Sequence, residues 1–234
     1  MDAAHRNALK GVSTATLTTV LLKKGLRNVW IRGAFPKQPG QARVVGPAFT
    51  LRFVPAREDL ATPASWASPI STRAAIEAMA EGDIAVADAM GVTDAGIFGD
   101  ILCARMAHRK VGALITDGVM RDIEGVLATG LPVWCAGQAA PPSVAGLTFV
   151  AWDQPVGCGG VAIFPGDVIC ADNDGAVVIP AAMVTEVTEL ALEQERHESW
   201  VIGEVRKGVP LPGLYPADAQ TRARYEEWRK TEKS

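Results

Sequence analysis

The sequence predicts an α/β fold with a mixed β core, formed by one domain. Short apolar runs of strand length alternate with helical segments between residues 84 and 135, which is typical of parallel βαβ units. Between residues 143 and 180, short apolar runs are separated by Gly, Pro, Asp and Asn, which indicates antiparallel strands. The length of 234 residues suits a single domain with a substantial core.

The N-terminal region supplies the first elements. A helix is expected over residues 13–24, which open with good N-cap residues and end before a glycine. A strand is expected over residues 29–32. Residues 42–54 predict two strands separated by a turn at Gly46 and Pro47.

The next segment, residues 55–69, contains three prolines separated by small polar residues. It predicts a surface excursion of the kind that often borders a functional site. A helix over 71–80 follows, with Ser71 or Thr72 as its N-cap. The remaining expected elements of the alternating region are a strand over 84–88, a helix beginning at Asp100, a strand over 113–116, a helix over 123–129 and a strand over 131–135.

The longest predicted helix covers residues 181–207 and carries many glutamates, as solvated helix faces do. Its apolar face is expected to consist of Val184, Val187, Leu190, Ala191 and Gln194. The domain is expected to end near residue 210. Residues 211–234 then form a C-terminal tail with a Pro-Gly-rich turn and a short charged helix.

Composition excludes several classes of protein. The formal net charge of −3 gives no reason to expect a nucleic-acid surface. No apolar run approaches the roughly 20 residues of a membrane helix, and no signal peptide is recognisable. The four cysteines, Cys103, Cys135, Cys158 and Cys170, lack metal-ligand spacing and are expected to be reduced and buried. These features predict a soluble, cytoplasmic protein.

Two glycine-containing motifs do not predict ligand sites. Residues 157–160, GCGG, lack both the lysine of a P-loop and its strand-to-helix context. Residues 172–175, DNDG, resemble the start of a calcium loop, but the glutamate of the twelve-residue pattern is missing.

The stretch from Gly99 to Asp122 is the most informative. Gly99 and Asp100 are expected to begin a helix, because glycine permits a tight approach and a carboxylate is favourable beside the positive end of the helix dipole. The amides of Ile101 and Leu102 would then point at an anion placed before the helix.

A short strand after this helix ends at Asp117 and Gly118, and Arg121 and Asp122 follow at the edge where open α/β sheets bind ligands. Arg121 offers a planar fork that matches a carboxylate. Asp122 and Asp100 are hard oxygen ligands suited to Mg²⁺ or Mn²⁺. A divalent ion beside an arginine-bound 2-oxo acid stabilises an enolate, as retro-aldol cleavage and β-keto acid decarboxylation require. The alternative is a simple helix cap and a surface ion pair.

The motifs GDIL (99–102) and DGVMRD (117–122), with twenty residues between Asp100 and Arg121, resemble the signature of the class II pyruvate aldolases. That family is typified by 4-hydroxy-4-methyl-2-oxoglutarate/4-carboxy-4-hydroxy-2-oxoadipate aldolase and shares its fold with the regulator of ribonuclease E activity A. The similarity covers roughly residues 10–210, including the segments 44–53, 81–91 and 155–180.

The resemblance implies a layered αββα-type sandwich, assembled as a trimer or a dimer of trimers with active sites between subunits. It implies catalytic roles for Asp100, Arg121 and a glutamate from the C-terminal helix of a neighbouring subunit. Glu198 matches that glutamate best, and Glu195 is the alternative. By the same resemblance, substrate binding falls to Gly99, Asp100, Ile101, Leu102 and Arg121, and metal binding falls to Asp122.

We therefore predict a Mg²⁺- or Mn²⁺-dependent lyase that cleaves a 4-hydroxy-2-oxo acid, such as 4-hydroxy-4-methyl-2-oxoglutarate, to pyruvate and a second carbonyl compound. Oxaloacetate decarboxylation uses the same enolate, and the sequence does not separate the two reactions. Two alternatives stay open. One is a non-catalytic regulator that binds ribonuclease E, although such regulators generally lack the aspartate after the arginine. The other is a different lyase or hydratase of 2-oxo acids, with residues 55–69 and Phe98 reshaping the pocket. No residue identifies the substrate's tail.

Overall fold

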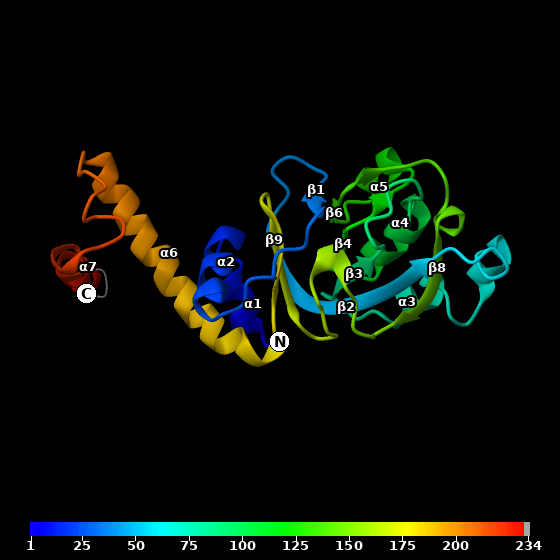
Figure 1. Ribbon diagram of the computed structural model, residues 1–234, viewed down its shortest axis with the longest axis horizontal. Coiled ribbons are helices and arrows are strands. Elements are labelled where there is room, and N and C mark those ends of the chain that lie inside the picture. Colours follow the sequence, from blue (N-terminus) through cyan, green and yellow to red (C-terminus); the bar gives the residue numbers. More distant parts are fainter. Residues whose placement is uncertain (232–234) are drawn as a thin grey trace.

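The computed structural model describes residues 1–231, and the main body of the protein has four layers in the order helix, sheet, sheet, helix (Figure 1). Three large hydrophobic clusters separate these layers, one between the two sheet layers and one under each helical layer. The predicted αββα sandwich with a mixed β core is therefore confirmed.

One eight-stranded mixed sheet supplies both β layers. The parallel part consists of β2 (Val44–Pro55), β3 (Ile84–Asp88), β4 (Ala113–Thr116) and β6 (Val133–Cys135). The antiparallel strands are β1 (Phe35–Pro36) beside β6, β8 (Leu147–Trp152) beside β2, and β9 (Val168–Asp172) with β10 (Gly175–Ile179) beyond β2. A separate two-stranded sheet pairs β5 (Val119–Met120) with β7 (Gly137–Gln138).

Alternate side chains of each strand face different layers, as the period of two requires. In β3, Ala85 and Ala87 face one helical layer, whereas Ile84 and Val86 face the other sheet layer. Burial on both faces explains why β3 is a continuous apolar run.

Helices cover both outer faces of the sandwich. One layer contains α3 (Thr72–Ala78), α4 (Asp100–His108) and α5 (Ile123–Ala128); the other contains α1 (Ala3–Leu9), α2 (Thr14–Lys23) and α6 (Val184–Arg206). The predicted N-caps form, because the Ser13 and Ser71 hydroxyls accept hydrogen bonds from the N–H groups of Thr16 and Ala74. Helix α1 is an addition to the predicted elements and is capped by the Asp2 carboxylate.

The predicted turn at Gly46 and Pro47 is wrong, because β2 is one continuous strand of twelve residues. The Ala48 N–H donates to Asp167 O on the side of β9. Successive N–H groups alternate sides, so the nitrogen of Pro47 faces the side where pairing with β3 begins only at Ala48. Proline thus interrupts no ladder bond at this position.

The strand expected over residues 29–32 is also wrong. Only an isolated bridge joins Trp30 to Val177, with one backbone hydrogen bond on each side of it. The chain turns at Gly33, whose φ of +82° is accessible to glycine at little cost.

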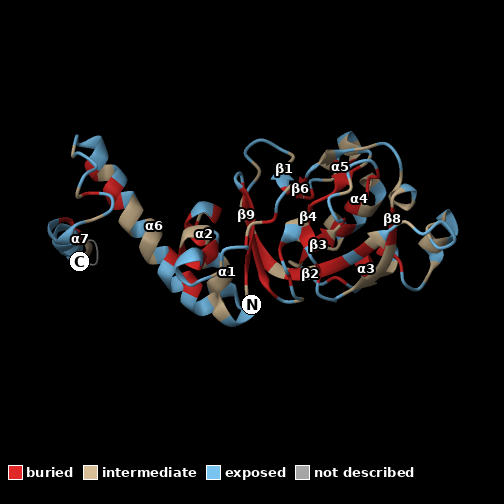
Figure 2. Ribbon diagram, in the orientation of Figure 1, coloured by how far each residue is buried: buried red, intermediate tan, exposed pale blue. Residues whose placement is uncertain are grey.

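The C-terminal arm, residues 198–231, projects from the sandwich (Figure 1). It contains the outer half of α6 and the helix α7 (Ala219–Thr231), joined by a small cluster of Trp200, Val201, Leu214 and Tyr225. Figure 2 shows that buried residues gather in the sandwich and that much of the arm is exposed. The last three residues of the predicted tail, 232–234, lie outside the described residues.

The buried face of α6 differs in part from the predicted one. Val187 and Ala191 are buried as predicted, and Thr188 joins them, but Leu190 is 42% exposed. None of the helices in residues 1–231 is long and apolar enough to span a membrane.

Replacing Gly46 by alanine should destabilise the fold. A Cβ atom there would lie 2.4 Å from Gly82 O and 2.9 Å from Ile84 Cγ1, so strand β2 would have to move. We expect a loss of about 1–3 kcal/mol in the free energy of unfolding, measured by urea denaturation. The control is Gly203→Ala in α6, where a Cβ meets nothing within 4 Å and helix propensity predicts a gain of up to about 1 kcal/mol. Equal stability of the two variants would contradict this account of β2.

Candidate active site

The segment 96–98 brings the two halves of the predicted site together. It runs beside β5, with a bridge from Gly96 to Val119 and a hydrogen bond from the Arg121 N–H to Phe98 O. Gly99 and the start of α4 therefore lie next to the end of β5. Arg121 and Asp122 follow β5 directly, and this strand is an addition to the elements that the sequence predicts.

Arg121 and Asp122 form an ion pair, with 3.0 Å between Nε and Oδ2. Asp122 adopts a left-handed conformation (φ 50°) before α5, and its carboxylate does not cap that helix. The two side chains are 35% and 45% exposed. The Nη groups of Arg121 and Oδ1 of Asp122 form no hydrogen bond within residues 1–231. These atoms are available to a ligand.

Asp100 occupies the first turn of α4, and its Oδ1 accepts a hydrogen bond from the Ile101 N–H at 2.7 Å. The amide of Ile101, one of the predicted anion donors, is thus already engaged by its neighbour. The amides of Asp100 and Leu102 donate to no acceptor in the described part of the chain. Within the described residues, the free amide donors at the N-terminus of α4 are therefore those of Asp100 and Leu102, whereas the sequence indicated those of Ile101 and Leu102.

Three glycines make room for the three charged residues. A Cβ atom on Gly99 would lie 2.6 Å from Asp122 Oδ2, and one on Gly125 would lie 2.7 Å from Asp100 Cβ. A Cβ on Gly96 would lie 2.7 Å from Arg121 Cβ. Sequence reasoning singled out Gly99 alone, because Gly96 and Gly125 acquire their role only through contacts between separate segments.

A pocket of about 260 Å³ contains these groups. Its lining includes Gly99, Asp100, Ile101, Leu102, Arg121 and Asp122, together with Trp66 and Arg73. Trp66 comes from the 3-10 helix η1 (Pro63–Ala67) of the predicted surface excursion, so the excursion does border this pocket. Phe98 does not line it, since its side chain is buried in the core. The sequence carried no signal for Trp66 or Arg73.

The two candidate glutamates of α6, Glu195 and Glu198, lie outside this pocket. Glu198 accepts hydrogen bonds from Gln194 Nε2 at 2.6 Å and from the Tyr215 hydroxyl at 3.3 Å. Helix α6 runs away from α4 and α5 (Figure 1), and neither glutamate lines the pocket with Arg121.

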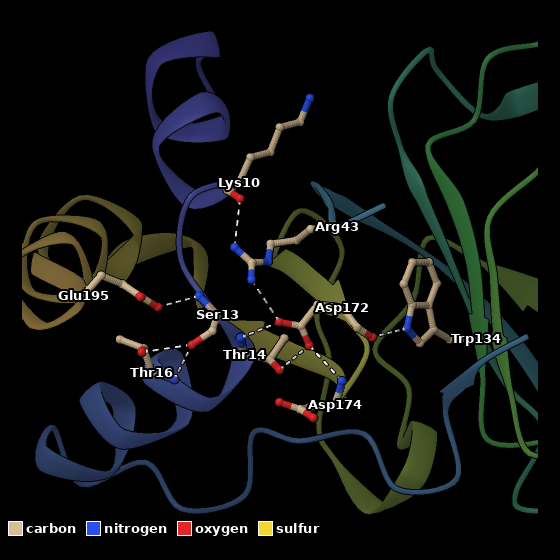
Figure 3. A network of polar contacts seen from close by, with 9 residues as sticks. All are labelled: Lys10, Ser13, Thr14, Thr16, Arg43, Trp134, Asp172, Asp174 and Glu195. Atoms are coloured by element: carbon tan, nitrogen blue, oxygen red, sulfur yellow. Dashed lines mark hydrogen bonds and ion pairs between the residues drawn. The ribbon is translucent and has the colours of Figure 1, made fainter. Parts of the chain in front are cut away.

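Glu195 belongs to a polar network that anchors the start of α2 (Figure 3). Its carboxylate accepts a hydrogen bond from the Ser13 N–H at 2.7 Å. Burial by itself would raise the pKa of Glu195, but hydrogen bonds from Ser13 and Thr16 outweigh it and lower that pKa. In the same network, Asp172 accepts hydrogen bonds from the amide and hydroxyl of Thr14. These carboxylates hold the helix α2 to the body of the protein.

Two amides of the segment 157–160 are likewise engaged by carboxylates. The Gly157 N–H donates to Asp88 Oδ2 and the Gly159 N–H donates to Asp117 Oδ2. Burial raises the pKa of the Asp117 carboxyl, although the N–H groups that it accepts from lower it. The GCGG segment thus closes the end of the parallel strands through polar contacts within the protein.

The four cysteines are unpaired and buried, as predicted. Burial raises the pKa of Cys103 and of Cys170 to about 12, so neither is a thiolate near neutral pH.

The pocket suits a hard divalent cation held mainly by water and substrate. Within residues 1–231, no three Asp, Glu, His or Cys side chains gather closely enough to hold a metal by themselves. Asp122 offers Oδ1, and Asp100 lines the same pocket. Mg²⁺ is commonly held by one or two carboxylates and keeps several waters, so this donor set fits it.

A family model described as RraA-like (Aldolase/RraA) matches residues 14–178. The chain therefore belongs to the RraA-like family, and the resemblance seen in the motifs is confirmed.

Two relatives show the range of this similarity. A protein of Halalkalibacterium halodurans named “Putative 4-hydroxy-4-methyl-2-oxoglutarate aldolase” is 32% identical over 154 residues, which are 65% of this chain and 67% of that protein. Protein DlpA of Legionella pneumophila is 30% identical over 170 residues, which are 72% of this chain. The match spans only 26% of the length of DlpA.

Solved structures agree with the fold. RraAS2 of Streptomyces coelicolor, described as an unusual member of the RNase ES inhibitor RraA protein family, has a TM-score of 0.77 and 34% identity and covers 86% of this chain and 96% of its own. An uncharacterized protein of Pseudomonas syringae pv. tomato has a TM-score of 0.81 at 24% identity, with coverage of 93% and 95%. The latter bears on the fold alone.

The Gly99→Ala variant should disturb the ion pair without unfolding the protein. Its Cβ would lie 2.6 Å from Asp122 Oδ2, the far end of a side chain that can rotate away. We expect a change of less than about 1 kcal/mol in the free energy of unfolding, since exposed ion pairs contribute little. Mn²⁺ affinity, measured by titration calorimetry, should fall at least tenfold. Gly137→Ala, whose Cβ would make ordinary contact with Val119 at 3.5 Å, is the control. Unchanged Mn²⁺ affinity in Gly99→Ala would argue against a metal at Asp122.

Proposed function

We propose that this protein is a divalent-metal-dependent lyase that cleaves a 4-hydroxy-2-oxo acid to pyruvate and a second carbonyl compound. One observation supports this most strongly. The free atoms of Arg121 and Asp122 and the open amides of α4 line one pocket, and glycines make the close packing of the charged residues feasible. Membership of the RraA-like family and relatives named as aldolases support the same reaction class.

Arg121 is proposed to bind the C1 carboxylate of the substrate. Its Nε is occupied by Asp122, so the two Nη groups are left to donate. The Asp100 and Leu102 amides add donors at the positive end of the α4 dipole. Together these groups hold the 2-oxo acid in one orientation, which lowers the entropic cost of reaction.

Asp122 is proposed to hold Mg²⁺ or Mn²⁺, largely through water, with Asp100 positioning one of the waters. When bound, such an ion polarises the keto oxygen and stabilises the negative charge of the pyruvate enolate. Cleavage also needs a base that removes the proton from the C4 hydroxyl as the C3–C4 bond breaks. The electron pair of that bond goes to C3, which later takes up a proton to give pyruvate.

Glu198 is proposed to serve that proton transfer in the pocket of a neighbouring subunit. Glu198 does not line the pocket of its own chain, and helix α6 runs away from α4 and α5 (Figure 1). An assembly in which the C-terminal arm reaches a second copy would supply the missing group, and a trimer or a dimer of trimers is the proposed assembly.

The alternative function is regulation of a ribonuclease by protein binding. It is favoured by the similarity to RraAS2, described as a member of an RNase ES inhibitor family. The position of Arg121 and Asp122 favours the enzyme instead, because their atoms that are unbonded within the described residues lie in one pocket that a small anion and a cation can enter.

The first test is pyruvate release from 4-hydroxy-4-methyl-2-oxoglutarate and from oxaloacetate, coupled to lactate dehydrogenase, with Mg²⁺, Mn²⁺ or EDTA. We expect metal-dependent release from at least one of the two. Asp122→Asn and Arg121→Ala should each lower kcat/KM by two orders of magnitude or more, as expected for groups that meet developing charge. Gly137→Ala is the control again. Absence of release together with absence of Mn²⁺ binding would favour the regulator.

Substitution of the two glutamates of α6 should change different properties, namely kcat for Glu198 and stability for Glu195. Glu198→Gln should lower kcat at least tenfold with unchanged Mn²⁺ affinity. Glu195→Gln should leave kcat unchanged and lower the free energy of unfolding by about 1 kcal/mol at pH 7. Because folding lowers the pKa of Glu195, its stabilising contribution is present above the ordinary glutamate pKa of about 4.3 and is lost as the pH falls through the folded-state value. The stability gap between wild type and Glu195→Gln should therefore close in acid. A kcat effect confined to Glu195→Gln would exchange the two roles.

A further inference from the structure

Arg73 is a second guanidinium in the pocket that the proposed mechanism does not use. It lies in the first turn of α3, and its side chain lines the same pocket as Arg121. Its Cζ is 5.0 Å from the ring centroid of Trp66, which is the distance of a cation–π contact. The indole thus supports the guanidinium at the wall of the pocket.

Arg73 has no carboxylate partner among the described residues. Two other arginines differ: Arg105 forms two hydrogen bonds with Glu77, and Arg57 forms two with Asp59. These bonds raise the pKa of Arg105 and of Arg57, whereas burial alone acts on Arg73 and lowers its pKa. Arg73 stays charged at neutral pH, and its guanidinium N–H groups form no hydrogen bond within the described residues.

The charges that line the pocket are Arg73, Arg121, Asp100 and Asp122, which sum to zero. A divalent cation at Asp122 would raise that sum to +2. A 2-oxo acid with one carboxylate would neutralise half of this charge, and a 2-oxo acid with two carboxylates would neutralise all of it. Charge balance therefore favours a dianionic substrate.

The space around Trp66 leaves room for the second anionic group. Trp66 lines the pocket and also a larger neighbouring cavity of about 470 Å³, so the two hollows meet at the residue that supports Arg73. A substrate held by Arg121 at one carboxylate can extend toward this wall. A single planar guanidinium suits a carboxylate, which it can bind through two parallel hydrogen bonds.

We propose that Arg73, supported by Trp66, determines specificity by binding the distal carboxylate of a dicarboxylic 2-oxo acid. This rests on the proposed function in placing the C1 carboxylate at Arg121 and a divalent cation at Asp122. The 4-hydroxy-4-methyl-2-oxoglutarate named above carries such a second carboxylate, and the new element is the residue assigned to bind it.

The test is binding rather than turnover. Calorimetry with saturating Mg²⁺ compares 2-oxoglutarate with 2-oxopentanoate, two five-carbon 2-oxo acids that differ in the C5 carboxylate and lack the C4 hydroxyl needed for cleavage. The wild type should bind 2-oxoglutarate at least about tenfold more tightly, the ratio expected for one charge-assisted contact. Arg73→Gln should abolish this preference and leave the affinity for 2-oxopentanoate unchanged.

Arg105→Gln is the matched control, because it removes one positive charge from the adjacent helix α4 without touching the pocket. It should keep the wild-type preference. Trp66→Leu removes the ring under the guanidinium and should reduce the preference in part. Thermal melting of each variant verifies folding. Because Arg73 is exposed, we expect Arg73→Gln to fold as the wild type does.

The proposal is overturned if the wild type binds the two acids equally, if it binds neither, or if Arg73→Gln weakens both equally. The pyruvate assay separates this from the proposed function. Pyruvate release without a binding preference would leave the lyase and reject the role of Arg73. A binding preference without pyruvate release would keep the role of Arg73 and reject the lyase.

Discussion

Strand β2 is the element on which the rest of the structure depends, since it belongs to both sheet layers. Its first residues pair with β9, and its later residues pair with β3 on one side and β8 on the other. Val45 lies in the cluster under α2 and α6, Ala48 lies between the sheets, and Leu51 lies under α3 and α4. Because Gly46 has no side chain, β2 can lie close to Gly82 and Ile84 at this position. Residues of β2 on both sides of Gly46 then contribute to the three clusters. The parallel strands β3 and β4 follow from this strand, and the segments after them, residues 96–98 and β5, bring the residues of the pocket together.

Electrostatics in the pocket depends on backbone packing. Arg121 and Asp122 would neutralise each other as an ordinary surface pair if both were fully satisfied. Instead, only one atom of each side chain takes part in the ion pair. The glycines beside the pair lack a Cβ atom, which allows the neighbouring segments to pack closely against both side chains. Within the described residues, the Nη groups of Arg121 and Oδ1 of Asp122 therefore stay free to bind a ligand. They lie near the N-terminus of α4, where the helix dipole favours an anion. This combination of fixed positions and unspent hydrogen-bonding capacity is what a site needs in order to bind a charged ligand.

The same contrast separates structural carboxylates from candidate functional ones. Asp117 and Asp172 accept several hydrogen bonds each, Glu195 accepts one from the Ser13 N–H, and all three tie segments that are distant in the sequence. Asp100 and Asp122 are less saturated and border a pocket. The projecting C-terminal arm adds a second theme, because Glu198 does not line the pocket of its own chain and its proposed role requires a second copy. The proposed catalysis is therefore a property of the assembly.

The family resemblance implied the layered arrangement, whereas the sequence by itself determined the α/β class and the pairing of Asp100 with Arg121 and Asp122. These depend on local periodicity and on motifs within one stretch of chain, which are legible without a structure. The tertiary structure alone decided the continuity of β2 through Gly46 and Pro47, the engagement of Glu195 with Ser13, and the entry of Trp66 and Arg73 into the pocket. Each of these depends on what a residue meets across the fold, namely the partner that a strand finds on each side, the donor that a carboxylate reaches, or the ring that supports a guanidinium. Such contacts between distant segments leave no periodic trace in the sequence.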